Sequence, residues 1–148
     1  MAPKLRIMVV DDHDAMRGAL ITLINNEADM IVVAEAECGR SAVQRVADSQ
    51  PDVIVMDIIM PNLNGIKATT QIKLAHPSVQ VVLLSGLYDY EEMSHLVAAG
   101  ASGYIHKLDA TDVLLDVIRI VARGDTYFGL MENQSNVASG RPPCRSGP

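Results

Sequence analysis

Five polar side chains follow short apolar runs in this chain, and together they could bind a divalent cation and accept a phosphoryl group. They are Asp11, Asp12, Asp57, Ser85 and Lys107. Short runs of Val, Ile and Leu between turn signals are typical of buried parallel strands. In an open parallel sheet, chemistry takes place in the crevice beyond the carboxyl ends of the strands. We therefore expect these side chains to converge on one small pocket.

The carboxylates of Asp12 and Asp57 should lie close together, because the first and third strands of such a sheet are neighbours. Like charges at this separation are unfavourable unless a cation neutralises them or one of them is protonated. Mg²⁺ prefers oxygen ligands and usually takes one or two carboxylates together with water or phosphate oxygens. One aspartate at a strand end can equally be a helix cap, but the set completed by Ser85 and Lys107 indicates a magnesium site for phosphoryl transfer.

Strand-like and helix-like segments alternate along the chain. The predicted strands are Leu5–Val10, Met30–Ala34, Val53–Met56, Val79–Leu84 and Gly103–His106. The predicted helices are Asp14–Asn25, Ser41–Asp48, Gly65–Ala75, Glu91–Ala99 and Thr111–Arg123. This alternation predicts an α/β fold: a doubly wound, five-stranded parallel sheet of order 2-1-3-4-5 with five helices, flavodoxin-like in topology.

Small and acidic residues mark the predicted helix ends. Gly100 and Gly124 follow the last two helices, where a left-handed glycine cap is expected. Asp109 precedes the last helix and can cap its first turn.

Composition sets the broad class of protein. The chain has 148 residues, 49% of them hydrophobic, and a formal net charge of -6. The length suits one domain, and the acidic balance argues against nucleic-acid binding. Cys38 and Cys144 lack metal-ligand spacing and are expected to be reduced thiols. Without a signal-peptide pattern or an apolar stretch of about 20 residues, we expect a cytoplasmic protein that does not interact with a membrane.

The composition changes after Phe128. Residues 129–148 are rich in Gly, Ser, Asn and Pro and show little apolar periodicity. Such a segment cannot bury enough surface to offset its ordering entropy. We expect one domain over residues 1–128 and a disordered tail or truncated linker over residues 129–148.

Four motifs together resemble the receiver domain of two-component response regulators. They are Val9-Val10-Asp11-Asp12-His13, the run from Asp57 to Gly65, Leu84-Ser85-Gly86, and Gly103-Tyr104-Ile105-His106-Lys107. Every signature position is filled, in order, between about residues 5 and 125. His13 and the last helix are similar to the NarL/LuxR-type branch, whose members usually carry a C-terminal helix-turn-helix effector that this chain lacks.

The resemblance implies a role for each residue of the acidic pocket. Asp57 would be the phosphoacceptor, and Lys107 would pair with it and then with the phosphoryl oxygens. Asp12 and Asp57 would bind Mg²⁺, with Asp11 in support. The backbone carbonyl of Ile59 would complete the protein ligands.

The resemblance also implies a conformational switch and its partners. Ser85 would hydrogen-bond the phosphoryl group, and Tyr104 would move inward in response. A sensor histidine kinase or phosphotransfer protein would supply the phosphoryl group, and phosphorylation could lead to a homodimer. The chain would act as a switch with at most self-phosphorylation and self-dephosphorylation chemistry, rather than as an enzyme, and would control transcription where an effector is attached.

Other interpretations fit fewer residues. Asp12-His13-Asp14 matches the D-x-D of haloacid dehalogenase-like phosphatases, but Met16 stands where Thr or Val is needed. Asp11-x-His13 matches part of a cobalamin-binding motif, whose glycine is again replaced by Met16. An FMN site would need a Ser/Thr/Gly phosphate loop after the first strand, and the residues that follow the first strand here do not form one. The strongest alternative is a pseudo-receiver that only binds partners, although such proteins usually lack an acidic or lysine position that this chain retains.

We predict that this chain alone does not bind DNA. Residues 129–148 are too few for a helix-turn-helix, and their basic residues are Arg141 and Arg145. Counterion release from so few contacts cannot give useful affinity at physiological salt. Fluorescence anisotropy with duplex DNA near ~150 mM salt should show no binding, and a sub-micromolar affinity would contradict this expectation.

Overall fold

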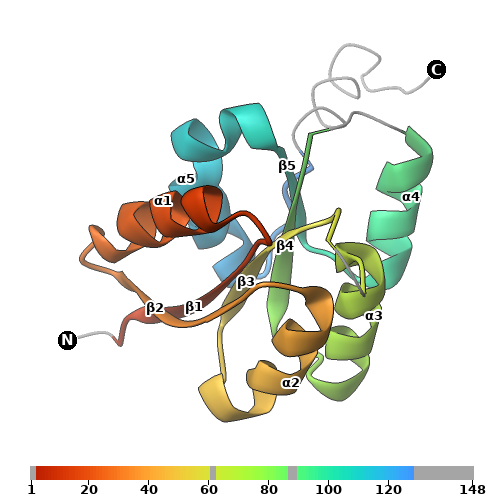
Figure 1. The fold of residues 1–148 in the computed structure, drawn as a ribbon, viewed down its shortest axis with the longest axis horizontal. Coiled ribbons are helices and arrows are strands. Elements are labelled where there is room, and N and C mark those ends of the chain that lie inside the picture. Colours follow the sequence, from red (N-terminus) through yellow and green to blue (C-terminus); the bar gives the residue numbers. More distant parts are fainter. Residues whose placement is uncertain (1–2, 61–62, 87–89, 129–148) are drawn as a thin grey trace.

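A computed structural model describes residues 3–60, 63–86 and 90–128, without the side chains of residues 90–92 (Figure 1). Its five parallel strands have the order β2-β1-β3-β4-β5. They are β1 (Leu5–Val10), β2 (Met30–Ala36), β3 (Val53–Asp57), β4 (Gln80–Ser85) and β5 (Gly103–His106). The predicted flavodoxin-like sheet is therefore confirmed, with β2 longer and β4 one residue later than expected. The predicted tail, residues 129–148, lies outside the described residues.

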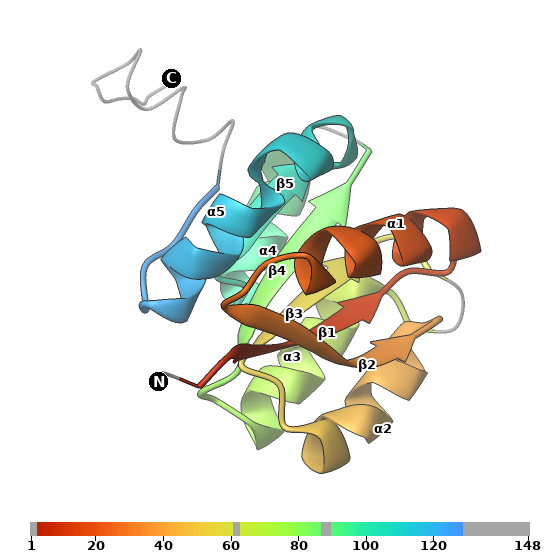
Figure 2. The same cartoon turned by 90° about the vertical axis from the view of Figure 1, so that its left-hand side faces the viewer.

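Five helices cover the two faces of the sheet. They are α1 (Asp14–Asn25), α2 (Gly39–Ser49), α3 (Gly65–Ala75), α4 (Tyr90–Ala99) and α5 (Ala110–Ala122). Helices α1 and α5 lie on one face, and α2, α3 and α4 lie on the other (Figure 2). A sheet covered on both faces needs apolar residues along the whole of each inner strand, which explains the continuous apolar runs.

The core forms two layers that the sheet separates. In β1, Ile7 and Val9 pack on the α1 and α5 side, whereas Met8 and Val10 pack on the α2, α3 and α4 side. This alternation is the two-residue period of a strand. Because both layers are filled, the carboxyl ends of the inner strands are held rigidly at one edge of the sheet.

The helix ends match the sequence in part. Gly100 and Gly124 adopt positive φ angles of 98° and 97°, as predicted for left-handed caps. The predicted Asp109 cap is wrong, because its side chain makes no capping hydrogen bond. Asp109 ends a short 3-10 turn in helical conformation, with φ -97° and ψ -6°, whereas a capping residue is usually extended. At the start of that turn, the His106 side chain accepts a hydrogen bond from the Leu108 amide.

The chain after α5 returns to the sheet. The Tyr127 amide donates to the Ser102 carbonyl at 3.0 Å, and the Tyr104 amide donates to the Tyr127 carbonyl at 2.8 Å. Tyr127 thus forms a parallel bridge with Gly103 on the outer side of β5. Phe128 packs against the core layer that contains Tyr104, and Tyr127 packs against the other layer. The sequence did not predict this contact.

Among the described residues, no helix combines the length and the apolar character needed to cross a bilayer.

We predict opposite effects for two Gly→Ala substitutions. A Cβ at Gly65 would lie 2.4 Å from the Asp57 carbonyl oxygen, so Gly65→Ala should lower the free energy of unfolding by about 1–3 kcal/mol. A Cβ at Gly18, inside α1, would meet no atom within 4 Å apart from its chain neighbours and the backbone of its own helix, so Gly18→Ala should raise the free energy of unfolding by about 0.5–1 kcal/mol. Urea denaturation measures both, and a Gly65→Ala protein as stable as wild type would show that the loop after β3 is not tightly packed.

Candidate functional site

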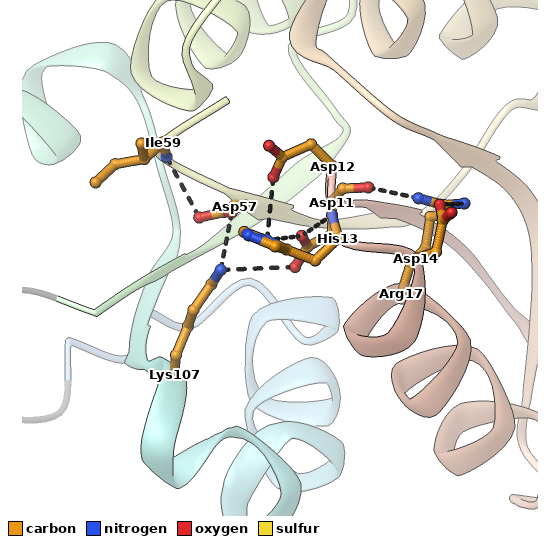
Figure 3. A network of polar contacts seen from close by, with 8 residues as sticks. All are labelled: Asp11, Asp12, His13, Asp14, Arg17, Asp57, Ile59 and Lys107. Carbon is orange, nitrogen blue, oxygen red and sulfur yellow. Dashed lines mark hydrogen bonds and ion pairs between the residues drawn. The ribbon is translucent and has the colours of Figure 1, made fainter. Parts of the chain in front are cut away.

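Four of the five predicted polar residues meet at the carboxyl edge of the sheet in Figure 3. Asp11 and Asp12 follow β1, Asp57 ends β3, and Lys107 follows β5. Parallel pairing sets this arrangement, since Val10 lies opposite Met56, and Asp57 lies opposite Leu84. Residues up to 96 positions apart in sequence are thereby brought into one cluster, as the strand-end pattern predicted.

An ion pair between Lys107 and Asp57 forms the centre of the cluster. Lys107 Nζ donates to Asp57 Oδ2 at 2.9 Å and lies 3.8 Å from Asp11 Oδ2. The Asp57 and Asp11 side chains are only 3% and 0% exposed. A buried carboxylate is costly unless it is paired. One ammonium group therefore faces two buried carboxylates.

Asp11 has an oxygen that remains without a donor. Its Oδ1 accepts from the His13 amide at 2.8 Å, whereas its buried Oδ2 has no hydrogen-bond partner among the described residues. Leaving a buried acceptor unsatisfied carries a desolvation penalty. A bound cation would remove that penalty, so this atom fits a metal ligand or a close neighbour of one.

Four side chains could hold one metal ion. One potential ligand atom from each of Asp11, Asp12, His13 and Asp57 lies within 4.8 Å of the other three. Carboxylate oxygens are the ligands that Mg²⁺ prefers. The residues present therefore fit a divalent cation, as the sequence predicted. The imidazole of His13 was not predicted to belong to this group.

The segment after β3 also orients Asp57. The Ile59 amide donates to Asp57 Oδ1 at 3.3 Å, while Lys107 takes Oδ2. The Gly65 amide donates to the Ile58 carbonyl at 2.8 Å, which connects the start of α3 to the segment after β3. The predicted role of the Ile59 carbonyl as a metal ligand stays a prediction, whereas the Ile59 amide contacts Asp57 directly.

The two predicted switch residues are buried on neighbouring strands. Ser85 ends β4 opposite His106, and Tyr104 lies on β5 opposite Leu83. Their relative exposures are 0% and 3%. Tyr104 is thus already inside the protein in this structure. The His106 ring lies 3.1 Å from the Gly86 carbonyl and joins the ends of the two strands. The roles of Ser85 and Tyr104 in switching stay predictions.

Burial and crowding shift the proton affinities of the central pair. Burial raises the pKa of Asp57, and the nearby Asp11 charge acts in the same direction, against the pairing with Lys107. Burial alone would lower the pKa of Lys107, but its bond to Asp57 and the charges of Asp11 and Asp12 raise it. A carboxylate whose pKa rises on folding destabilises the fold as the pH rises through that pKa. Added positive charge beside Asp57 would favour its ionised form and offset this loss of stability.

Arg17 holds the loop after β1 but does not neutralise the pocket. Its guanidinium donates to the Asp11 carbonyl at 2.8 Å, to Asp14 at 2.6 Å and to Glu35 at 2.9 Å. Arg17 is the nearest cation that follows Asp11 and Asp12 in the sequence. Its pairing with Asp14 was not predicted, although the i,i+3 spacing within one helix is a signal that could have found it. The partner on β2, Glu35, gave no such local signal. These contacts raise the pKa of Arg17 and direct its charge away from the acidic cluster.

Comparison with known proteins assigns the family. Residues 7–119 match the family described as response regulator receiver domain, and the chain belongs to this family. It is 38% identical over 125 residues to the transcriptional regulatory protein DegU of Brevibacillus brevis, covering 84% of this chain and 53% of that protein. It is 31% identical over 124 residues to the response regulator protein VraR of Staphylococcus aureus, covering 84% of this chain and 59% of that protein. The chain therefore spans little more than half the length of these curated relatives.

Solved structures agree with this assignment. A LuxR-family two-component response regulator from Aurantimonas gives a TM-score of 0.83 at 29% identity, covering 88% of this chain and 94% of that one. The receiver domain of a putative response regulator NarL from Mycobacterium tuberculosis gives 0.79 at 24% identity, covering 83% and 99%. This second likeness shows the fold. The chain is thus a response regulator receiver domain, and a LuxR-family two-component response regulator is among the solved structures that it resembles.

We predict that Mg²⁺ stabilises the protein through this cluster. A ligand at 100 times its Kd adds about 2.7 kcal/mol to the free energy of unfolding, so millimolar Mg²⁺ should raise Tm measurably at neutral pH. Asp12→Asn should remove most of that rise, because it deletes a charged ligand. Asp48→Asn, an exposed substitution on α2, should keep it.

Scanning fluorimetry with and without Mg²⁺ measures these shifts, and circular dichroism checks that both variants fold. An equal rise for Asp12→Asn and wild type would place the metal away from the cluster.

Proposed function

We propose that this receiver domain is a phosphorylation-controlled switch in which Asp57 accepts a phosphoryl group in the presence of Mg²⁺. The observation that supports this most directly is the 2.9 Å bond from Lys107 Nζ to Asp57 Oδ2 beside the carboxylates of Asp11 and Asp12. This is an oriented nucleophile next to a fixed positive charge and a cluster suited to a divalent cation. A pseudo-receiver that only binds partners would not need this complete set.

The proposed reaction transfers a phosphoryl group from a donor to the acceptor carboxylate. An Asp57 oxygen attacks phosphorus, and the bond between phosphorus and the donor's leaving group breaks, giving an acyl phosphate. Phosphoryl transfer depends mainly on positioning and on neutralisation of the equatorial oxygens. Lys107 supplies one fixed charge beside Asp57. Bound Mg²⁺ would supply the other charge, held by Asp12 and Asp57 with Asp11 and the Ile59 carbonyl in support.

The contacts around Asp57 prepare it for this role. The Ile59 amide and Lys107 each occupy one carboxylate oxygen, which fixes the orientation of the carboxylate plane. Burial makes its ionised form less stable in the unmodified protein. Metal binding favours the ionised, nucleophilic form, because added positive charge lowers a carboxylate pKa. Metal binding and nucleophile activation would therefore be coupled.

The proposed response passes through the ends of β4 and β5. The hydroxyl of Ser85 would donate to a phosphoryl oxygen, and Tyr104 would favour its inward position. Each contact formed only in the phosphorylated state shifts a two-state equilibrium by its differential free energy. The affected region would be the loop after β4, α4 and β5.

The proposed donor is a sensor histidine kinase or a phosphotransfer protein, and the proposed place of action is the cytoplasm. DegU carries the name transcriptional regulatory protein, so we propose transcriptional control as the output of the whole protein. Residues 1–128 would form the receiver and residues 129–148 a tail or linker, while a DNA-binding effector would lie outside this chain. Phosphorylation would favour a homodimer of receivers.

We predict that acetyl phosphate with Mg²⁺ adds one phosphoryl group to the protein and none to Asp57→Asn. Intact-mass spectrometry measures the addition, and hydroxylamine should remove it, because the bond formed is an acyl phosphate. Asp48→Asn is the matched control, since it removes one exposed carboxylate far from the cluster, and it should be labelled like wild type.

Labelling of Asp57→Asn to the wild-type extent would assign the acceptor to another residue. An absence of labelling in wild type and Asp48→Asn alike, with Mg²⁺ binding demonstrated, would favour the pseudo-receiver.

A further inference from the structure

We propose that His106 is a positioning residue for phosphoryl acceptance: its neutral imidazole joins the end of β4 to the turn that carries Lys107, and so holds Lys107 beside Asp57. This inference rests on the proposed function and goes beyond it, because it assigns a role to a side chain outside the acidic cluster. His106 acts through Lys107 and through the backbone at the strand ends.

The two ring nitrogens of His106 contact two different parts of the chain. Nδ1 lies 3.1 Å from the Leu108 amide nitrogen, in the short turn after β5. Nε2 lies 3.1 Å from the carbonyl oxygen of Gly86, which directly follows β4. Both partners are backbone atoms. The ring therefore links its own turn to a segment 20 positions earlier in the sequence.

These partners determine which ring nitrogen carries the proton. An amide nitrogen can only donate and a carbonyl oxygen can only accept, whereas a neutral imidazole has one donor and one acceptor. Nδ1 must therefore be unprotonated, and Nε2 must carry the hydrogen. The other tautomer would set an N–H group against the Leu108 amide and a lone pair against the Gly86 carbonyl. His106 is thus the Nε2–H tautomer, and both of its nitrogens are used.

The link lies where the pairing of β4 with β5 ends. Ser85 lies opposite His106, and this is the last pair in the register of the two strands. Gly86 and Lys107 follow it immediately, so the ring continues the connection beyond the ladder. The Leu108 side chain is 84% exposed and gives the turn no anchor in the core. The bond from the Leu108 amide to the ring supplies an anchor instead.

Lys107 depends on this turn because it must reach across a strand. It follows β5, whereas Asp57 ends β3, and β4 lies between these two strands. Its side chain points toward Asp57 (Figure 3), and Nζ donates to Asp57 Oδ2 at 2.9 Å. A lysine side chain is long and flexible, so the place of its ammonium group depends on the direction of its backbone. The ring contact between His106 and Leu108 fixes the residues on both sides of Lys107 and sets that direction.

Two substitutions of His106 separate a specific contact from simple bulk. An Asn side chain can accept from the amide two residues later, as in an Asx turn, but it is shorter than imidazole and does not reach Gly86. A Leu side chain keeps the bulk and removes both hydrogen bonds. His106→Asn should therefore keep the turn that directs Lys107, and His106→Leu should lose it.

The test is the rate at which acetyl phosphate labels the full chain at saturating Mg²⁺, followed by intact-mass spectrometry. A displacement of about 1 Å can cost about 100-fold in rate, so we expect His106→Leu to be labelled about 10- to 100-fold more slowly than wild type. His106→Asn should recover most of that loss. His76→Leu and His76→Asn are matched controls, since His76 follows α3 beside the amino end of β4, and they should be labelled like wild type. Circular dichroism checks that all variants fold.

NMR of the unmodified protein gives a readout that a general loss of stability would not move. The imidazole nitrogens of His106 should show an unprotonated Nδ1 and a protonated Nε2 at neutral pH, and a protonated Nδ1 would overturn the proposal. The ammonium group of Lys107 should give the resonance of an ion-paired lysine in wild type and His106→Asn. In His106→Leu that resonance should move toward the position of an exposed lysine such as Lys67.

Failure of this inference is separable from failure of the proposed function. A His106→Leu protein labelled as fast as wild type would overturn the inference and leave the proposed function intact. Equally slow labelling of His106→Asn and His106→Leu, or slow labelling with an unchanged Lys107 resonance, would also overturn it, because the turn would then not be the cause. If wild type is not labelled at all, the proposed function fails. The Lys107 resonance, measured without a phosphoryl donor, still decides whether His106 positions Lys107.

Discussion

Crowding of buried negative charge at one edge of the sheet is the constraint on which the rest of this structure depends. Asp11 and Asp57 are both excluded from water, and Lys107 is the ammonium group between them. Such a cluster costs free energy unless its geometry is held from outside. The two filled core layers provide that rigidity, because a sheet packed on both faces cannot relax to separate its strand ends. The fold thus maintains an electrostatic imbalance that a cation or a new covalent group can change.

The loops around the cluster fix the orientation of its carboxylates. Ile59 and Lys107 each engage one oxygen of Asp57, so the carboxylate cannot rotate freely. Arg17 donates a hydrogen bond to the backbone carbonyl of Asp11, and its guanidinium forms ion pairs with Asp14 and Glu35. The two positively charged side chains near the pocket, Lys107 and Arg17, therefore make different contacts. Lys107 pairs with Asp57, and Arg17 holds the loop after β1.

The sequence predicted the sheet order and the convergence of Asp11, Asp12, Asp57 and Lys107, because the rule that strand ends meet at one edge needs only strand identity and order. It could not predict contacts set by side-chain reach across the fold. Glu35 meets Arg17 only through pairing of β2 with β1, and the ring of His13 turns toward the aspartates only after the loop folds. The Asp109 cap failed because a 3-10 turn intervenes, which depends on how β5 meets α5.

The return of the chain along β5 has a consequence for solubility. β5 ends the sheet, and a terminal strand offers unpaired amides and carbonyls to which other polypeptides can add. Tyr127 occupies two of these groups, the Ser102 carbonyl and the Tyr104 amide. Strand addition by a neighbouring molecule at this place must first displace the protein's own segment. The last described residues thus protect this part of the β5 edge from pairing with a strand of another molecule.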